Sequence, residues 1–285
     1  MPIHIEDHAG SIRARCTLQG ASATGKFEAY LEGEGADHSA ALGSLTLAVS
    51  GVCNELGLAN KAGPQILVSV DIVLLTLQDG LLSTVLLRRD HGPFEGVFTI
   101  PGGFVHPTQD VSDLEAAKRV LRAKTGLESP YLEQLRTFAG VGRDPRGWSV
   151  AIAYYALVPR ELLDLGERTD VAITPLSKVQ SLPFDHGAIL EEAANRVLSK
   201  SSYSSLPVHL CGEAFTLPQL QAIYESLMGE HLDKVTFRRK ILEMGVVEPI
   251  EGKLSHGGGG RPAQLYRRIP NERAPLGLAA RAFKS

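Results

Sequence analysis

A glycine pair between an apolar run and a helical segment constrains the fold of this chain more than any other feature. The run ends at Leu87-Arg-Arg89, Pro101-Gly-Gly-Phe-Val105 follows, and the segment from Arg119 to Leu127 reads Arg-Val-Leu-Arg-Ala-Lys-Thr-Gly-Leu. Ser112 can cap a helix that runs to Thr125, with Glu115 at the capping-box position and Gly126 at its end. Its predicted buried stripe consists of Leu114, Ala116, Ala117, Val120 and Leu121.

This segment resembles the signature of the Nudix family. That pattern has a Gly, five residues, a Glu, seven residues, and then Arg-Glu-aliphatic-x-Glu-Glu-x-Gly-aliphatic. When Arg119, Gly126 and Leu127 are aligned with the pattern, its three later Glu positions hold Val120, Ala123 and Lys124. The loop is two residues too long, so the first Glu position holds Gln109 counted forwards or Val111 counted backwards. None of these residues is a carboxylate.

The missing carboxylates argue against catalysis. Nudix enzymes gather carboxylates around Mg²⁺, and a hard divalent cation needs oxygen ligands that Val, Ala and Lys do not provide. We therefore predict a protein that is not an enzyme, with no catalytic residues, no metal site and no required cofactor. The alternative is a Nudix hydrolase of nucleoside diphosphate derivatives whose displaced Mg²⁺ site uses Asp110, Asp113 and Glu115. These acids also suit the first turn of a helix, where its dipole favours negative charge.

Length and composition fit a two-domain cytoplasmic protein. The 285 residues are enough for two ordinary domains, and no apolar run approaches the ~20 residues that span a membrane. The first residues lack the cationic start and apolar stretch of a secretory signal. Cys16, Cys53 and Cys211 are too few and too dispersed for a disulfide framework or a zinc site. We expect no membrane partner.

The charge is distributed unevenly along the chain. The net charge is −3, but residues 231–285 hold eleven Lys or Arg against five acids, a net +6 that leaves −9 for residues 1–230. A basic segment attached to an acidic domain is typical of a nucleic-acid-binding module.

The chain divides into five predicted parts. Residues 1–64 form an N-terminal extension of unknown role, partly helical because His38 to Leu56 has helical spacing. Residues 65–200 alternate strands and helices, beginning with a hairpin whose turn is Gln78-Asp-Gly80. The Ser-rich segment 201–207 is the predicted linker, residues 208–270 are a second domain, and residues 271–285 are a basic tail.

The second domain has the order helix, turn, helix, hairpin, which predicts a winged helix-turn-helix. Thr216 caps the first helix and Asp233 caps the second, in which Phe237, Ile241 and Met244 share the core face. Thr236 and Arg239 point away from that face and Arg238 and Lys240 flank it, as a recognition helix requires. The alternative is a solvated basic face. The predicted DNA-binding residues are Lys234, Thr236, Arg238, Arg239 and Lys240 on the helix, with Lys253 and Arg261 on a wing whose tip is Gly257–Gly260.

An arginine-rich group in the first domain is the predicted effector site. Arg143-Asp-Pro-Arg146 places two guanidinium groups on one turn, and such pairs bind phosphate bidentately. The alternative is an Asp144-anchored turn whose arginines bridge domains. Arg88 and Arg89 alternate on a strand, so only one is expected to face the cleft, and Arg119 can be a structural remnant. Phe184-Asp-His186 could be a catalytic pair, but a cap and packing element is the more common arrangement. The predicted effector-binding residues are Arg88, Arg89, Gly102, Gly103, Arg119, Arg143 and Arg146.

Together these motifs resemble the Nudix-related transcriptional regulators of the NrtR type, over roughly residues 65–270. The resemblance rests on Val68-Ser-Val-Asp-Ile-Val-Leu, Pro101-Gly-Gly-Phe-Val, Arg143-Asp-Pro-Arg-Gly, Phe184-Asp-His, Phe237-Arg-Arg-Lys and Gly260-Arg-Pro-Ala-x-Leu-Tyr266.

The resemblance implies an α+β chain in which a Nudix-like α/β/α sandwich precedes a C-terminal winged helix. It further implies a homodimeric repressor of NAD biosynthesis or salvage genes that binds a palindromic double-stranded DNA operator. The implied effector is a nucleotide such as ADP-ribose, NAD or ATP. On this basis Arg239→Ala should abolish operator binding, and Arg143→Ala should leave operator binding intact but weaken the effector response.

Overall fold

The computed structural model describes residues 3–8, 11–22, 25–35, 41, 44–45, 66–128, 131–163, 168–255, 262–270 and 283. The chain forms two compact units, Met1–Gln65 and Ile66–Ser285, which are described separately. Among the residues in these ranges, no helix is long and apolar enough to cross a membrane.

The first unit contains a three-stranded antiparallel sheet in the order β1 (Ile3–His8), β2 (Ser11–Ser22) and β3 (Gly25–Gly35). The sequence prediction of a partly helical extension missed these strands. It followed the abundance of Gly and Ala and overlooked the period-two alternation in Ile12-Arg-Ala-Arg-Cys16. Of the predicted helix from His38 to Leu56, only Ala41, Ser44 and Leu45 are described, and all three are helical.

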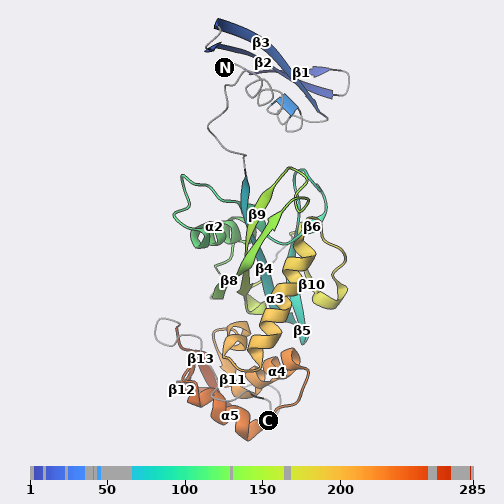
Figure 1. The fold of residues 1–285 in the computed structure, drawn as a ribbon. Helices are drawn as coiled ribbons and strands as arrows, with labels where there is room; N and C mark the ends of the chain where they lie inside the picture. The colour runs from blue at the N-terminus through green and yellow to red at the C-terminus, as the bar shows by residue number, and fades with distance from the viewer. Residues whose placement is uncertain are drawn as a thin grey trace. The chain divides into compact units, whose positions relative to one another are not determined.

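The second unit begins with a seven-stranded mixed sheet (Figure 1). The strand order is β10-β5-β4-β9-β8, with β6 paired to β5 and β7 paired to β4. Only the β4–β9 pair in this sheet is parallel among the described pairings. The predicted hairpin is confirmed, with Asp79-Gly80 as its turn. The strands are β4 (Leu67–Gln78), β5 (Leu81–Arg88), β6 (Phe98–Thr99), β7 (Gly102–Phe104), β8 (Tyr131–Gly140), β9 (Ser149–Leu157) and β10 (Val171–Pro175).

Helices cover both faces of this sheet, as the predicted α/β/α sandwich requires. Residues Val70, Ile72 and Leu74 of β4 pack in the core under α2 (Asp113–Thr125). Val73 and Leu75 alternate with them and pack in the opposite core with α3 (His186–Ser201). Figure 1 shows α2 and α3 on opposite sides of the sheet. Short 3-10 helices at Arg160–Leu162 and Leu176–Lys178 complete the domain.

The capping pattern places α2 as predicted, with one error in its buried face. The Ser112 hydroxyl accepts a hydrogen bond from the backbone N–H of Glu115, and Gly126 ends the helix in the left-handed conformation. Ala116, Ala117, Val120 and Leu121 are buried, but Leu114 is 37% exposed. Leu114 lies at the edge of the stripe that these four residues form around the helix, so spacing alone misplaced it.

The C-terminal elements form the predicted winged helix. Helix α4 (Leu217–Met228) has a reciprocal capping box between Thr216 and Gln219, and α5 (Lys234–Glu243) is capped by Asp233. Strands β11 (Phe215–Thr216), β13 (Ala263–Arg268) and β12 (Val247–Ser255) form an antiparallel sheet in that order. Phe237 and Ile241 are buried as expected, and Met244 packs against the same core.

The segment predicted as a polar linker is packed rather than loose. Helix α3 continues to Ser201, and the 3-10 helix η3 (Leu206–Leu210) follows after one turn. Ser204 and Leu206 are fully buried, and the Tyr224 hydroxyl donates to the Ser204 carbonyl at 2.8 Å. The serines satisfy backbone groups locally, so a Ser-rich composition here accompanies burial.

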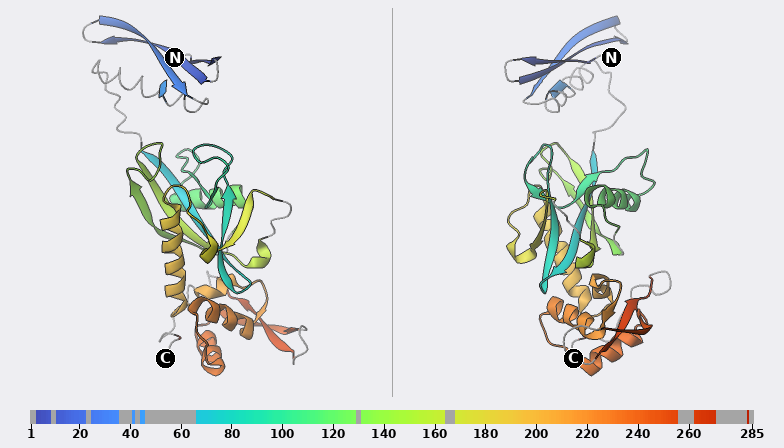
Figure 2. Two further views of the ribbon diagram at one scale, coloured as in Figure 1. Left: turned by 90° about the vertical axis from the view of Figure 1, so that its right-hand side faces the viewer. Right: turned by 180° about the vertical axis from the view of Figure 1, so that it is seen from behind.

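The Nudix-like sandwich and the winged helix therefore share apolar core. Leu206, Leu210 and Leu227 belong to the same buried cluster as Ile189 and Val197 of α3. The views in Figure 2 show α3 leading from the sheet into the helices of the winged helix. In the predicted basic tail only Phe283 is described; it is buried against Tyr224 and Phe237.

Candidate ligand-binding and DNA-binding sites

A cavity of about 600 Å³ opens where β4, β7, the last turn of α2 and the start of α3 meet. The loops after β5 and β8, the end of β6 and the residues just before β10 form the rest of its wall. Six of the seven predicted effector residues line it, namely Arg88, Arg89, Gly102, Gly103, Arg143 and Arg146.

The glycine pair is required by two close approaches. A Cβ atom on Gly102 would collide with the Asp71 carboxylate, and one on Gly103 would lie 2.9 Å from Cγ2 of Val120. Val120 stands at one of the positions where the Nudix pattern has a Glu, and it is buried in the apolar core. This position therefore supplies an apolar contact between α2 and β7 in place of a carboxylate.

We expect Gly103→Ala to lower the free energy of unfolding by about 1–3 kcal/mol, because the added methyl group overpacks the contact with Val120. Combining it with Val120→Ala should recover part of that loss relative to Val120→Ala alone. A double-mutant cycle measured by urea unfolding tests this, and strictly additive effects would contradict a direct contact.

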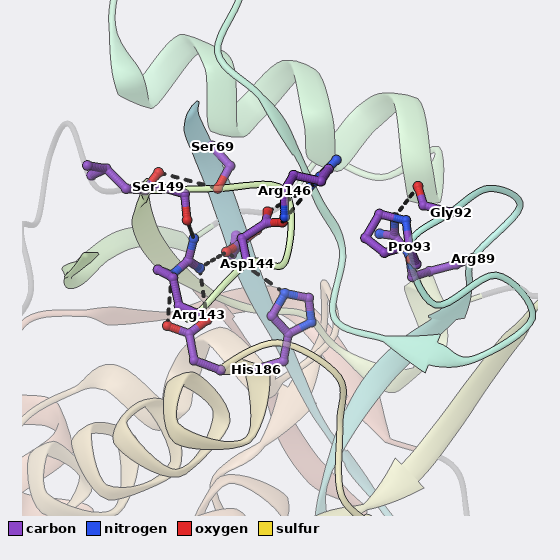
Figure 3. A network of polar contacts seen from close by, with 12 residues as sticks. Ser69, Arg89, Gly92, Pro93, Arg143, Asp144, Arg146, Ser149 and His186 are labelled. Atoms are coloured by element: carbon purple, nitrogen blue, oxygen red, sulfur yellow. Dashed lines mark hydrogen bonds and ion pairs between the residues drawn. The ribbon is translucent and has the colours of Figure 1, made fainter. Parts of the chain in front are cut away.

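Arg143 lies at the centre of a buried polar network (Figure 3). Its Nε and Nη2 atoms donate to Asp185 at 2.9 and 2.8 Å, and Nη2 also donates to Asp71 at 3.3 Å. Its Nη1 atom donates to the Ser149 hydroxyl at 3.0 Å. The side chain is only 9% exposed, so Arg143 joins β4, β9 and the start of α3.

Burial perturbs two titratable groups near Arg143, namely Asp71 and His186. Desolvation raises the pKa of Asp71, although His186 and Arg143 act in the opposite direction. Desolvation lowers the pKa of His186, whose Nε2 atom is 3.9 Å from the Asp71 carboxylate. Perturbed carboxyl and imidazole groups on a cavity wall are typical of a ligand site.

A second cationic group, Arg89 and Arg146, faces the cavity more openly. Arg146 donates to both Asp144 carboxylate oxygens at 3.0 and 2.7 Å, and its guanidinium group lies over the Phe104 ring. Arg89 donates to the Pro93 carbonyl at 2.7 Å and lies over the Phe184 ring. Burial and the nearby Arg146 charge lower the pKa of Arg89. An anion between these guanidinium groups would relieve that repulsion.

Two predictions about arginines are corrected by these positions. Both Arg88 and Arg89 line the cavity, because β5 ends at Arg88 and strand alternation does not extend to the next residue. Arg119 is the predicted effector residue that does not line it. It donates to Asp110 at 2.7 and 2.8 Å and to the Phe104 carbonyl at 2.9 Å, which ties α2 to the loop before it.

The three acids of the alternative metal site have separate partners. Asp110 pairs with Arg119, Asp113 accepts from the Tyr154 hydroxyl at 2.9 Å, and Glu115 pairs with Lys118 at 2.8 Å. Across the described residues, no three His, Cys, Asp or Glu side chains form a metal-binding group. The donor set that Mg²⁺ needs is not gathered here.

The cavity lining includes residues that were not predicted as site residues, among them Asp71, Lys124, Arg168 and Phe184. Asp71 could have been found as the single charged residue in the apolar run Val70-Asp-Ile-Val-Leu-Leu75. Phe184 has a positive φ of 58°, and its Asp185 neighbour binds Arg143 instead of capping α3 with its side chain. Arg168 lies more than forty residues after Leu127, the last residue of the Nudix-like segment, and no recognisable motif in the sequence marks it as a site residue.

Helix α5 exposes most of the predicted DNA-binding side chains. Lys234, Arg238 and Arg239 are exposed, and Arg239 lies 3.8 Å from the Glu243 carboxylate. Thr236 is half-buried, and Lys240 turns toward the Phe283 ring, 5.6 Å from its centre. Lys253 is exposed on β12, whereas Arg261 and the Gly257–Gly260 tip lie outside the described residues.

The junction between the two domains contains a half-buried polar cluster that packs on the buried His209 ring. Lys200 of α3 donates to both Glu133 carboxylate oxygens at 2.7 Å, and the Tyr131 hydroxyl also donates to Glu133. The His209 ring packs on Tyr131 with 4.5 Å between centres. Desolvation, aided by the Arg268 charge, lowers the pKa of His209 to about 3.

Acidification should therefore weaken the junction. An unfolded His209 takes up a proton near its ordinary pKa, but the folded state resists protonation down to the lowered value. The stability that neutral His209 contributes is thus present above about pH 6.5. The free energy of unfolding should fall by about 2 kcal/mol between pH 7 and pH 5. Urea unfolding at several pH values measures this, and His209→Phe should flatten the dependence. An unchanged slope in that variant would assign the acid sensitivity to other groups.

Comparison with known proteins agrees with both halves of this description. The family described as the NrtR DNA-binding winged helix domain matches residues 207–268. An "ADPR responsive transcriptional repressor NtrR" of Acinetobacter baylyi is 39% identical over 208 residues, which cover 72% of this chain and 82% of that protein. The structure of Shewanella oneidensis NrtR in complex with a 27-mer DNA is 35% identical, with a TM-score of 0.70, covering 75% of this chain and 98% of that one.

A hydrolase is also similar, over a shorter region. An ADP-ribose pyrophosphatase of Methanocaldococcus jannaschii is 30% identical over 109 residues, which cover 38% of this chain and 63% of that enzyme. The longer matches include both the Nudix-like sandwich and the winged helix in one chain. The chain therefore belongs to the NrtR family of Nudix-related transcriptional regulators.

Proposed function

We propose that this protein is a transcriptional repressor of NAD biosynthesis or salvage genes that releases its operator when a nucleotide effector fills the cavity. The observation that carries this proposal is one chain that joins an exposed basic helix α5 to a Nudix-like cavity lined by arginine and lysine, in which Val120, Ala123 and Lys124 stand at the positions of the Nudix glutamates. The similarity to the ADPR-responsive repressor of Acinetobacter baylyi favours ADP-ribose over NAD or ATP. Binding to chromosomal DNA would take place in the cytoplasm.

The proposed DNA complex is a homodimer on a palindromic operator. In such complexes each recognition helix enters a major groove, and the separation of the two helices must match the half-site spacing. Lys234, Arg238 and Arg239 would reach phosphates and base edges from α5, and Lys253 would reach the backbone from the wing. An effector that changes the angle between the two winged-helix domains of the dimer would weaken binding at both half-sites together.

Helix α3 connects the cavity to the winged helix, so a change at the cavity can be transmitted along it to the DNA-binding domain. Asp185 and His186 place its first turn at the cavity, where Arg143 holds it. Lys200 in its last turn pairs with Glu133, and the shared core continues into α4. A ligand shifts the operator-bound population only by binding two arrangements of these elements with different affinity.

We further propose that the protein does not hydrolyse its effector. Val120, Ala123 and Lys124 stand at the positions of the family's carboxylates, and Asp110, Asp113 and Glu115 are each held by a different partner. The similarity to the archaeal pyrophosphatase supports the fold of the sandwich more than its chemistry, because the acids that bind Mg²⁺ are missing here.

A gel-shift experiment tests the proposal. DNA from upstream of NAD-metabolism genes is titrated with the protein in the presence and absence of ADP-ribose, NAD or ATP. Specific binding weakened by one nucleotide is the expected result. Absence of specific binding to any such DNA, together with Mg²⁺-dependent hydrolysis of ADP-ribose to AMP and ribose 5-phosphate, would favour the hydrolase instead.

A further inference from the structure

We propose that Lys124, together with Arg89, forms a metal-independent subsite for the diphosphate group of the effector. The inference rests on the proposed sensing function and specifies its chemistry. In Nudix enzymes Mg²⁺ neutralises the diphosphate. Here the residues at the corresponding positions do not fit a divalent cation, and one of them is itself a cation.

Only the last turn of α2 reaches the cavity. Ala123 and Lys124 line it, Val120 is buried under Gly103, and Arg119 is held outside by Asp110. The small Ala123 side chain leaves space beside Lys124. The helix therefore presents one ammonium group to the cavity where the family pattern has carboxylates.

The charges around the cavity leave its cations available for an anion. Six Lys or Arg and four Asp line the wall. Three of these aspartates are paired with arginine, in the pairs Asp71–Arg143, Asp144–Arg146 and Asp170–Arg168, and Asp90 contacts His91. Within the described ranges, Arg88, Arg89 and Lys124 have no carboxylate in ion-pair contact, although the Asp90 charge acts on both Arg89 and Lys124 from a greater distance. Three cations and one carboxylate thus remain outside the arginine–aspartate pairs, and the net charge of these four groups is positive.

A divalent cation would be repelled by the same wall. Arg89 already experiences the neighbouring Arg146 charge, and its guanidinium group is positioned by the Pro93 and Gly92 carbonyls rather than by an acid. A diphosphate placed between Arg89 and Lys124 would receive charge-assisted hydrogen bonds from both sides, and no metal would be needed to offset its charge.

Calorimetric titration of the full chain with ADP-ribose, in EDTA and in MgCl₂, tests the subsite. We expect the same affinity in both media to within about threefold, because nothing in the wall recruits the metal. Lys124→Glu should weaken binding roughly tenfold or more in EDTA, since it replaces a charge-assisted contact by repulsion. Lys118→Glu is the matched control, because Lys118 lies on the same helix, is 56% exposed and pairs with Glu115 outside the cavity.

The possible outcomes separate this inference from the proposed function. Wild-type binding that requires Mg²⁺, or Lys124→Glu protein that binds as tightly as wild type, would overturn the subsite while leaving ADP-ribose as the effector. Absence of binding in both media would overturn ADP-ribose as the effector, and the subsite with it. Lys124→Met distinguishes lost attraction from added repulsion, with an expected effect in the same direction but smaller.

Discussion

Replacing Arg238 and Arg239 together by Ala is expected to abolish specific operator binding and to leave the protein folded. Both side chains are exposed on α5, and among the described residues Arg239 makes one ion-pair contact, with Glu243 at 3.8 Å. Their removal therefore costs little stability. A base or phosphate contact is worth about 1–3 kcal/mol, so losing two per subunit should weaken binding roughly a hundredfold or more.

Gel shift or fluorescence anisotropy at several salt concentrations measures this effect. Loss of phosphate contacts should also reduce the slope of log affinity against log salt. Arg122→Ala provides a control, because Arg122 is 71% exposed on α2 and pairs only with nearby Glu128 in the described structure. Normal operator binding by the Arg238/Arg239 variant would show that α5 is not the recognition helix.

Arg143→Ala should destabilise the protein by about 3–5 kcal/mol, because it leaves Asp71 and Asp185 without their shared cation. This differs from the expectation drawn from the sequence, in which the substitution affected only the effector response. The pKa of Asp71 is already raised by burial and should rise further once the arginine is gone. The destabilisation should thus be largest above that raised pKa and smaller in acid, where the folded state holds a neutral Asp71.

Denaturant unfolding of Arg143→Ala and of Arg143→Ala with Asp71→Asn provides the measurement. The second substitution removes the stranded charge, so it should restore part of the lost stability. A variant as stable as wild type would show that the two carboxylates are solvated and that Arg143 is free to bind ligand. Arg146 is the better residue for an effector test, because its side chain is 35% exposed and it pairs with a single aspartate.

The elements that sequence predicted well are those specified by local chemistry. Ser112, Thr216 and Asp233 each cap the helix expected of them, and Gly126 and Gly229 end α2 and α4 in the left-handed conformation. A cap depends on residues three or four positions away, so it can be identified without knowing the fold. The apolar runs that form β4 and β5 are local in the same sense.

The features that sequence predicted poorly depend on distant partners. Arg143 is buried because Asp71 lies 72 residues before it and Asp185 lies 42 residues after it. Lys200 pairs with Glu133 across 67 residues, so the Ser-rich segment next to it is packed against a surface its composition does not reveal. Leu114 lies at the edge of the buried stripe of α2 and is 37% exposed, whereas its neighbour Asp113 accepts a hydrogen bond from Tyr154 of the sheet. None of these pairings leaves a periodic pattern in one sequence.

The apolar core that joins Val197 and Leu206 to Leu227 also limits how this protein can be dissected or recombined. A cut at residues 201–207 would expose leucines on both fragments and leave the Ser204 carbonyl without the Tyr224 hydroxyl. Neither half is an exchangeable module at that boundary. A chimera that joins this Nudix-like domain to a different DNA-binding domain must therefore exchange the last turns of α3 together with the winged helix.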